Sequence, residues 1–424
     1  MAMELVRGTR DFSPSEAISL KETISVIEEI FKRFGFYPLM TPSMEAMDTL
    51  NSKAYGQQSR NEIYALDDGK TGMRYDLSVP LARYVSMNKD ITMPFKRYQI
   101  EKVWRRDEPQ KMRAREFIQA DIDIVGSTDP ISDAETMAAA ALAIEALGID
   151  DYVILLNSRI FINAILDKYK VPRDKQMAAI VAIDKLAKTT RKEVIDQLSA
   201  IGIDQRISES MLNFMKDEMD NEQKLQRLAT ETDGVKAEVG RMLELLKTVG
   251  SYGLRGEITI DFSLARGLNY YTGAIWEFVA FRDGRQMPTI VAGGRYDGLI
   301  GLYTKAAIPA VGTSIGVNRI FELLQNGKSA QTYAKIFVAY IGKDNAGYAI
   351  GIANMLRGRG LYADLNAKER NISKQLEYAN SLRIRYAVIV GNAEREQNKV
   401  KLRDMINGSE QMLNIDELIQ TIKG

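Results

Sequence analysis

The first regular pattern in the chain covers residues 13–35, SPSEAISLKETISVIEEIFKRFG, where apolar positions recur at the spacing of one helix face. Ser13 or Ser15 can cap the first turn, and Pro14 suits that turn. Gly35 suits the end of a helix. The pattern therefore predicts a capped amphipathic helix.

Strand patterns follow, separated by polar breaks. Residues 36–47, FYPLMTPSMEAM, indicate a strand interrupted by prolines, and residues 71–87, TGMRYDLSVPLARYVSM, indicate a strand and then a helix. A strand period would place Asp76 and Ser78 on one face. Residues 95–126 contain two strand-like runs around a charged turn, which predicts an antiparallel hairpin with a long loop.

The hairpin carries two features that suggest chemistry. Gln119, Asp121 and Asp123 alternate along its second run and so share one face of the strand. This row is either the floor of a buried polar pocket or the wet face of an ordinary strand. The loop, residues 103–117, places arginines and a lysine among acidic residues. It is either a phosphate-binding loop, because guanidinium groups pair with phosphate oxygens, or a solvated charged turn.

Three later stretches also depart from simple patterns. Residues 311–324, VGTSIGVNRIFELL, predict a strand, a glycine break and a helix with Arg319 near its start, where a cation opposes the helix dipole. Gly293 and Gly294 permit a close backbone approach. Residues 264–278, LARGLNYYTGAIWEF, would suit a buried strand, yet an arginine and two adjacent tyrosines interrupt it. Such local violations hint at function.

The pattern of strand-like and helix-like segments divides the chain into three parts. Residues 1–160 and 251–325 carry most of the strand patterns. Residues 161–250 are almost entirely helical in period, so they form an insertion between these two segments. Residues 333–424 follow a polar linker and alternate short β-runs with helices, which predicts a small three-layer α/β domain.

Composition narrows the possible chemistry. The length of 424 residues favours two or three domains, and the net charge of +1 means that a nucleic acid would be bound through local patches. The chain has no cysteine and no histidine, which excludes disulfides, Cys/His zinc sites and Ser-His-Asp or Cys-His mechanisms. It has no apolar signal core and no run of about 18 apolar residues, so we expect a cytoplasmic protein without membrane contact.

These parts, in this order, resemble a class II aminoacyl-tRNA synthetase over essentially the whole chain. Residues 35–45, GFYPLMTPSME, resemble the first motif of the class, with Pro42 as its proline. Residues 103–117 resemble the second motif. Residues 311–324 resemble the third, with Arg319 as its arginine.

Two longer peptides resemble the histidyl-tRNA synthetase family within that class. They are residues 265–278, ARGLNYYTGAIWEF, and residues 292–299, AGGRYDGL, and their length makes a chance match improbable. Residues 7–12, RGTRDF, resemble the opening peptide of the family. The sequences RRDEP at 105–109 and DIDIVG at 121–126 are closer to the archaeal and eukaryotic branch of this family.

The resemblance implies an architecture and a reaction. The fold would be an α+β catalytic domain with a mixed, mainly antiparallel sheet flanked by helices, a helical insertion, and a C-terminal α/β anticodon-binding domain. The reaction would be that of a histidine–tRNA ligase. L-Histidine and ATP give histidyl-adenylate and pyrophosphate, and histidine then passes to the 3′ end of tRNA(His). A homodimer is implied through the first motif.

The resemblance also implies an ATP site. Arg105 and Arg266 would be catalytic and would contact the α-phosphate. The remaining arginines would hold the outer phosphates, a phenylalanine would stack on the adenine, and a glutamate would bond its edge. Mg²⁺ would accompany ATP, bound by phosphates and water rather than by a protein metal site. The implied ATP-binding residues are Arg105, Glu108, Arg113, Phe117 and Arg319.

The implied histidine site uses carboxylates. One group of residues around an aspartate would hold the α-ammonium. A second aspartate and a tyrosine would pair with the two imidazole nitrogens, which can each donate or accept a proton. A further tyrosine would form the wall. The implied residues are Asp76, Leu77, Ser78 and Gln119 for the first group, and Asp123, Tyr271 and Tyr270 for the second.

Two other functions fit parts of the sequence. One is a regulatory synthetase paralogue of histidine biosynthesis without charging activity, although such paralogues usually lose the C-terminal domain and erode the signature peptides. The other is a class II synthetase for proline, threonine or glycine, which the peptide ARGLNYY at 265–271 disfavours.

Overall fold

The computed structural model describes residues 3–52, 54–55, 57–110, 112–186, 189–216, 218–266, 270–324, 330–368 and 370–423. The chain divides into two compact units. The first consists of Met1–Arg10 and Thr23–Leu324, and the second consists of Asp11–Glu22 and Gln325–Gly424. The domain boundaries expected from the sequence divide the chain more finely and stay predictions.

Helix α1, Pro14–Arg33, forms where the sequence pattern predicts it. A capping box closes its first turn: the Ser13 amide donates to Glu16 Oε2 (2.8 Å), and the Glu16 amide lies 3.4 Å from Ser13 Oγ. Gly35 follows the helix with a φ of 74°, in the left-handed region that glycine adopts without strain. Both predicted ends of the helix are confirmed.

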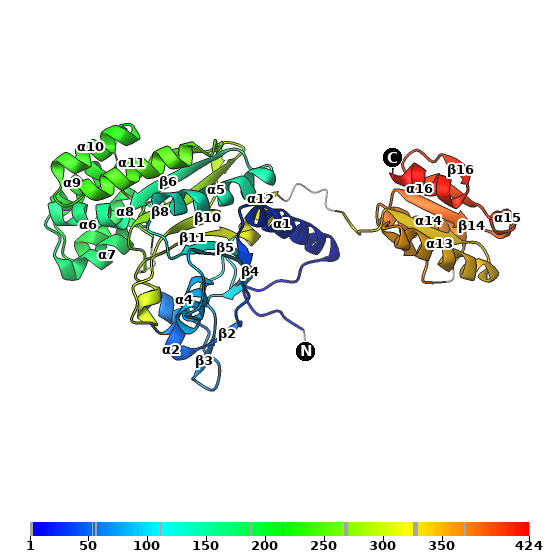
Figure 1. Ribbon diagram of the computed structural model, residues 1–424, viewed down its shortest axis with the longest axis horizontal. Coiled ribbons are helices and arrows are strands. Elements are labelled where there is room, and N and C mark those ends of the chain that lie inside the picture. Colours follow the sequence, from blue (N-terminus) through cyan, green and yellow to red (C-terminus); the bar gives the residue numbers. More distant parts are fainter. Residues whose placement is uncertain are drawn as a thin grey trace. The chain divides into compact units, whose positions relative to one another are not determined.

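A mixed sheet forms the body of the first unit (Figure 1). Its strands among the described residues are β1 Tyr37–Pro38, β4 Phe95–Trp104, β5 Glu116–Val125, β6 Tyr152–Ser158, β7 Glu257–Ile260, β8 Ala274–Arg282, β9 Arg285–Gln286, β10 Val291–Arg295 and β11 Ala310–Gly316. Their order is β1-β4-β5-β11-β10-β8-β6-β7, with β9 paired to β8. Pairing is antiparallel except between β1 and β4 and between β6 and β7. The expected mainly antiparallel sheet is confirmed.

The hairpin predicted over residues 95–126 is formed by β4 and β5. Its register pairs Arg97 with Asp123 and Gln99 with Asp121. Strand β11 lies on the other side of β5 and pairs Gly312 with Asp123. The polar row of β5 therefore lies in the middle of the sheet rather than at its edge.

Helices flank this sheet, and a second, two-stranded sheet pairs β2 (Met44–Ala46) with β3 (Thr71–Met73). Between β6 and β7 the described residues form only helices, α6 to α11, which gather beside the large sheet in Figure 1 and confirm the helical insertion. In the described ranges, no helix combines the length and apolarity needed to cross a membrane. The helices are α2 Met47–Leu50, α3 Gln57–Asn61, α4 Ser78–Met87, α5 Pro130–Ala146, α6 Arg159–Lys168, α7 Arg173–Ile183, α8 Arg191–Ala200, α9 Gln205–Met215, α10 Asn221–Glu231, α11 Lys236–Gly250, η1 Ile300–Leu302 and α12 Val317–Leu324.

The second unit is a three-layer α/β structure, as the sequence predicts. Its elements are β12 Ile336–Tyr340, η2 Lys343–Asn345, α13 Ala346–Gly358, β13 Ala363–Leu365, α14 Ile372–Ser381, β14 Tyr386–Val390, α15 Asn392–Glu396, β15 Val400–Asp404, β16 Glu410–Leu413 and α16 Ile415–Lys423. The strand order is β13-β12-β14-β15-β16. One apolar cluster joins α13 and α16 to the sheet, and another joins α14 to the alternate residues of the same strands.

One local prediction is wrong. Asp76 and Ser78 do not share a strand face, because β3 ends at Met73 and α4 begins at Ser78. Asp76 Oδ1 instead accepts hydrogen bonds from the amides of Ser78 (3.1 Å) and Val79 (3.0 Å). Such local bonds satisfy the free amides of a first helical turn, which competes with strand formation.

Candidate active site

The polar row on β5 is buried. Gln119, Asp121 and Asp123 are 8%, 3% and 2% exposed, so the alternative of a wet strand face is excluded. Gln119 Nε2 donates to Ser314 Oγ on β11 (2.5 Å) and lies 3.4 Å from Asp121 Oδ1. The row is therefore the floor of a polar site held between two neighbouring strands.

Asp123 is held by two residues that the sequence analysis did not assign to the site. Arg97, fully buried on β4, forms an ion pair with Asp123 Oδ2 (2.7 Å). The hydroxyl of Tyr296 donates to Asp123 Oδ1. Space for Asp123 comes from Gly312, since a Cβ there would overlap the carboxylate. The hairpin register could have found Arg97, and Tyr296 stands within the quoted peptide AGGRYDGL.

Burial shifts the acids of this floor toward their protonated forms. It raises the pKa of Asp121 to about 7, where Arg97 opposes the shift and Asp123 adds to it. Burial also raises the pKa of Asp123, against the opposing charge of Arg97. The pKa of Asp76 is raised by burial as well. Three carboxyl groups in one dry site would be stabilised by a cationic ligand.

Asp76, Leu77 and Ser78 lie at the start of α4. Asp76 is 3% exposed, and its second oxygen, Oδ2, is buried; the buried Tyr55 hydroxyl interacts with this carboxyl group, but no described residue makes a hydrogen bond of ordinary geometry to Oδ2. Leu77 is fully buried, and its carbonyl accepts from Arg97 Nη2 (3.1 Å). The side chain of Ser78 interacts with the Tyr270 hydroxyl. Arg97 thus joins this helix start to the β5 row.

Three tyrosines form a second wall. The rings of Tyr270 and Tyr271 are 4.8 Å apart between centroids, and those of Tyr270 and Tyr296 are 5.8 Å apart. Tyr271 packs directly over β10, because a Cβ at Gly294 would come within 2.7 Å of its ring. The close backbone approach predicted at the paired glycines is confirmed, and its purpose at Gly294 is to seat Tyr271.

Arg105 connects the arginine-rich loop to the β5 row. Its Nη2 donates to Gln119 Oε1 (3.3 Å), and its Nε donates to the Tyr75 carbonyl (3.2 Å). The guanidinium lies 4.4 Å from the ring centroid of Tyr75 and 5.1 Å from that of Phe117. These contacts fix a cation in place between two aromatic rings.

Arg266 has a left-handed backbone conformation, and one nitrogen of its side chain has no hydrogen-bond partner among the described residues. Its φ of 46° lies in the left-handed region, which costs about 1–3 kcal/mol for a residue of this kind. Its guanidinium lies 5.2 Å from the ring centroid of Tyr271. Nη1 is buried and finds no hydrogen-bond partner among the described residues. The next three residues, 267–269, lie outside the described ranges.

Three other arginines influence the charge state of Arg319. Burial lowers the pKa of Arg319, and the positive charges of Arg105, Arg113 and Arg266 lower it further, with only Glu277 opposing. Arg319 Nη1 donates to the Thr289 carbonyl (2.5 Å). A buried cation that three other arginines influence lies in a positive field that suits a polyanion.

The outer part of the loop pairs internally. Arg113 Nε donates to Asp107 Oδ2 (2.8 Å), and Glu108 pairs with Arg7. The side chains of Arg113 and Glu108 are 47% and 62% exposed. Of the five residues assigned to ATP from the sequence, Arg113 and Glu108 are therefore engaged with other partners.

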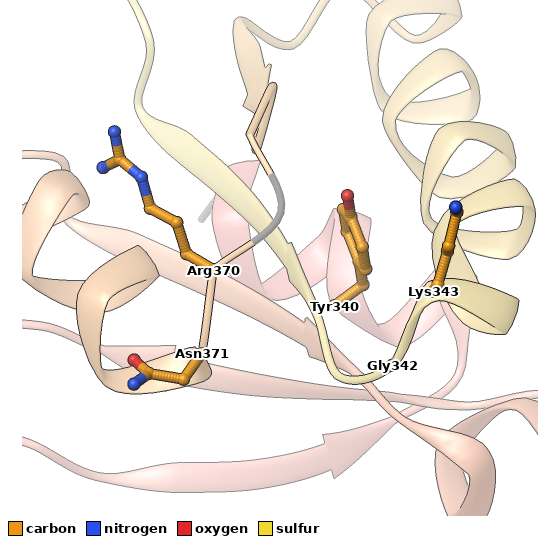
Figure 2. A pocket seen from close by; sticks show the side chains of 5 residues that line it. All are labelled: Tyr340, Gly342, Lys343, Arg370 and Asn371. Atoms are coloured by element: carbon orange, nitrogen blue, oxygen red, sulfur yellow. The ribbon is translucent and has the colours of Figure 1, made fainter.

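The second unit contains a separate cavity of about 320 Å³ (Figure 2). It lies at the carboxyl end of β12, between the loop after β12 and the start of α14. Figure 2 shows Tyr340, Lys343 and Arg370 around it, with Gly342 and Asn371 on its rim. An aromatic ring beside two cations suits an anionic ligand with a planar group.

Comparison with known proteins covers the whole chain. The family model described as Histidyl-tRNA synthetase matches residues 8–320, and the model described as Anticodon binding domain matches residues 335–424. The histidine–tRNA ligase of Phocaeicola vulgatus is 34% identical, over 98% of this chain and 98% of that protein. The one from the archaeon Korarchaeum cryptofilum is also 34% identical, over 99% and 98%. The relatives from Phocaeicola vulgatus and Korarchaeum cryptofilum are equally identical to this chain, so the predicted branch stays a prediction.

Solved structures agree in fold. The histidyl-tRNA synthetase of Nostoc sp. PCC 7120 superposes with a TM-score of 0.84 and 27% identity, over 100% of this chain and 99% of that one. An ATP phosphoribosyltransferase regulatory subunit/histidyl-tRNA synthetase from Bacillus halodurans gives a TM-score of 0.76 at 18% identity, over 92% and 98%. The second likeness shows the fold alone. The family model and the near-complete matches at 34% identity show that the chain belongs to the histidyl-tRNA synthetase family.

Proposed function

We propose that the chain is a histidine–tRNA ligase, which activates L-histidine with ATP and transfers it to the 3′ end of tRNA(His). One arrangement carries this proposal: Arg319 feels the positive charges of Arg105, Arg113 and Arg266, and Arg105 and Arg266 both contact a buried pocket of carboxylates and tyrosines. The cations suit the polyphosphate of ATP, and the buried acids suit the two basic groups of histidine.

The first step is attack of the histidine carboxylate on the α-phosphorus of ATP, with pyrophosphate as the leaving group. Negative charge builds on the oxygens of that phosphorus, so fixed cations aimed at them lower the barrier. Arg105 and Arg266 take this role. Arg113 and Arg319 hold the outer phosphates, and Phe117 stacks on the adenine. The unsatisfied Nη1 of Arg266 supports its assignment.

ATP replaces two existing ion pairs in this scheme. Arg113 leaves Asp107 for a phosphate, and Glu108 leaves Arg7 for the adenine edge. The Arg7–Glu108 pair is exposed on both sides and contributes at most about 1 kcal/mol, whereas Asp107 is only 11% exposed and keeps its place when Arg113 moves to a phosphate. Mg²⁺ would accompany ATP, held by phosphate oxygens and water rather than by a protein metal site.

The α-ammonium of histidine binds at the start of α4. The buried Oδ2 of Asp76, which no described residue satisfies, accepts one of its protons. Ser78 and Gln119 accept the others, and Leu77 closes the pocket behind them. A buried acceptor without a hydrogen bond costs free energy until a ligand donates to it, so the site favours a ligand with an amine over one with an apolar group at this position.

The imidazole binds between the β5 row and the tyrosines. One ring nitrogen donates to Asp123, which Arg97 and Tyr296 hold in place. The Tyr271 hydroxyl pairs with the other nitrogen, and Tyr270 forms the wall. A site built to make two hydrogen bonds rejects amino acids that leave them unmade, by roughly 10⁴-fold.

Transfer to tRNA uses the other parts of the chain. The cavity of the second unit (Figure 2), with Lys343 and Arg370, suits a phosphate, and Tyr340 suits an unstacked base. The helical insertion contacts the acceptor stem through phosphates, without reading sequence. We also propose that the chain works as a homodimer in the cytoplasm.

The test is ATP–pyrophosphate exchange with each of the twenty amino acids, followed by charging of tRNA(His). Exchange with histidine alone, and then charging, is the expected result. Exchange with another amino acid would replace the proposed substrate. Folded protein that exchanges with none would support the regulatory paralogue instead, and the arginines would then be remnants of a lost activity.

A further inference from the structure

Arg295, at the end of β10, is a buried cation that the proposed reaction does not use. It is 3% exposed. Its guanidinium binds the first turn of α5 and the segment before it. Nε and Nη2 donate to the two oxygens of Asp133 on α5, and Nη1 donates to the Ser127 carbonyl (2.8 Å). Nη1 also lies 3.2 Å from Asp297 Oδ1. A forked, bidentate grip of this kind fixes position as well as charge.

The main chain of Arg295 supports the tyrosine wall. The Thr272 amide, directly after Tyr271, donates to the Arg295 carbonyl (2.8 Å), and the Asp297 amide donates to Thr272 Oγ1 (3.0 Å). Gly294, the preceding residue, lies beneath the Tyr271 ring. Movement of Arg295 would therefore move the Tyr271 hydroxyl that is assigned to the imidazole.

The helical insertion is rooted on the same segments. At its start, the Arg159 amide donates to the Gly273 carbonyl (2.9 Å), two residues after Tyr271. At its end, Glu238 on α11 accepts from the Ser158 hydroxyl (2.6 Å). The start of the insertion is thus bonded close to Tyr271, and its last helix is bonded to Ser158, the residue directly before that start.

A third contact closes the connection. Arg241 on α11 donates to the Thr128 carbonyl (2.8 Å), and Thr128 lies in the segment that Arg295 grips. Figure 1 shows α11 running beside α5. A cavity of about 80 Å³ lies among these groups, so they have room to shift. Its charged lining consists of Asp133, Glu238, Arg241, Arg295 and Asp297.

We propose that Arg295 is a positioning residue that couples the helical insertion to the histidine pocket. Through its side chain it holds the segment to which Arg241 of the insertion is bonded, and through its main chain it holds Tyr271. The insertion therefore sets how well the site binds histidine, while ATP binding on the arginine side is independent of it. The inference rests on the proposed function, because it takes Tyr271 as a histidine contact.

The test measures pyrophosphate exchange against histidine and ATP separately. Arg295→Lys keeps a positive charge but loses the fork. Asp133→Asn keeps the shape of its partner and is the milder change. Both variants should lower kcat/KM for histidine by about 10-fold to 100-fold through a higher KM, which is the size of effect that a small misplacement causes. The KM for ATP should stay near the wild-type value. Arg241→Met should give a smaller effect of the same kind.

A matched control is Lys96→Met, which removes an ion pair with Glu135 on the same helix α5 without touching Arg295. It should leave both KM values unchanged. In the double variant of Arg241 and Arg295, the loss should be smaller than the product of the single losses, because both act through one connection. Folded variants with a wild-type KM for histidine, KM values that rise together, or multiplicative losses would each overturn the coupling. Wild-type protein without any exchange would overturn the proposed function itself.

Discussion

Single residues carry the strongest signs of chemistry in this chain. Arg266 combines a left-handed backbone with a buried nitrogen that no described residue pairs with, and it shares a positive field with Arg319. Asp76 presents a buried oxygen without a hydrogen bond from the described residues. Strain and unsatisfied groups both cost free energy, so they persist where a ligand repays that cost. The cation lies where a phosphate is proposed and the acid where an amine is proposed.

The proposed role of Arg266 can be tested by its removal. Arg266→Ala should lower the rate of adenylate formation by about 10²-fold or more, because one preorganised donor to the developing charge is lost. Histidine affinity should change little. Single-turnover adenylate formation with saturating ATP and histidine would measure the rate, and equilibrium dialysis of histidine would measure affinity. Arg255→Ala, at an exposed ion pair, is the control. A near-normal rate in folded Arg266→Ala would exclude the catalytic role.

The raised pKa of Asp121 makes stability depend on pH. The folded chain keeps this proton up to about pH 7, whereas the unfolded chain loses it near the ordinary value of 3.8. The folded state therefore loses stability as pH rises from about 4 to 7, by about 1.4 kcal/mol for each pH unit at most. Asp121→Asn removes the titration. Its Tm relative to wild type should be higher at pH 8 than at pH 5, and equal differences at both pH values would contradict the buried, protonated acid.

At the scale of elements, the site depends on how closely β11 approaches β5. A Cβ at Gly312 would overlap Asp123 Oδ1 and come within 2.9 Å of the Ile122 carbonyl. The strand can relieve this overlap only by moving Asp123 or by separating from its neighbour.

Gly312→Ala should therefore raise the KM for histidine by about tenfold or more and lower the Tm, because the carboxylate that pairs with the imidazole is displaced. Pyrophosphate exchange and thermal melting would measure the two effects. Gly316→Ala lies on the same strand, where a new Cβ meets nothing closer than 3.5 Å. It should leave the histidine KM unchanged. Equal behaviour of the two variants would show that the close approach of β11 is not needed.

Much at this scale was predictable from the sequence, and the failures concern contacts that leave no periodic pattern in it. The hairpin, the helix after Gly316 and the shared face of the polar row followed from period and turn chemistry, whereas the burial of that row did not. Asp76 and Ser78 were placed on a strand because their side-chain bonds to a helix start leave no periodic trace. Arg97 was missed because its role depends on a cross-strand partner.

At the scale of the whole molecule, one exposed apolar segment bears on the proposed homodimer. Three large apolar side chains within residues 37–44 are exposed: Tyr37 by 67%, Met40 by 81% and Met44 by 56%. These residues fall in the stretch that resembles the first class II motif. Scattered apolar residues are normal on a surface, but several within one short segment suit an interface. A symmetric dimer would cover the same segment on both subunits.

Light scattering of the purified chain should accordingly give twice the monomer mass of 47.6 kDa. Met40→Glu would bring a charge from each subunit into the proposed apolar interface, so it should shift the protein toward the monomer at micromolar concentration. Ile406→Glu is the matched control, because Ile406 is equally exposed, at 79%, but belongs to the second unit. It should remain dimeric. A wild-type monomer, or a Met40→Glu variant as dimeric as the control, would show that this segment is not the interface. Pyrophosphate exchange by the monomeric variant would then reveal whether the active site is complete within one chain.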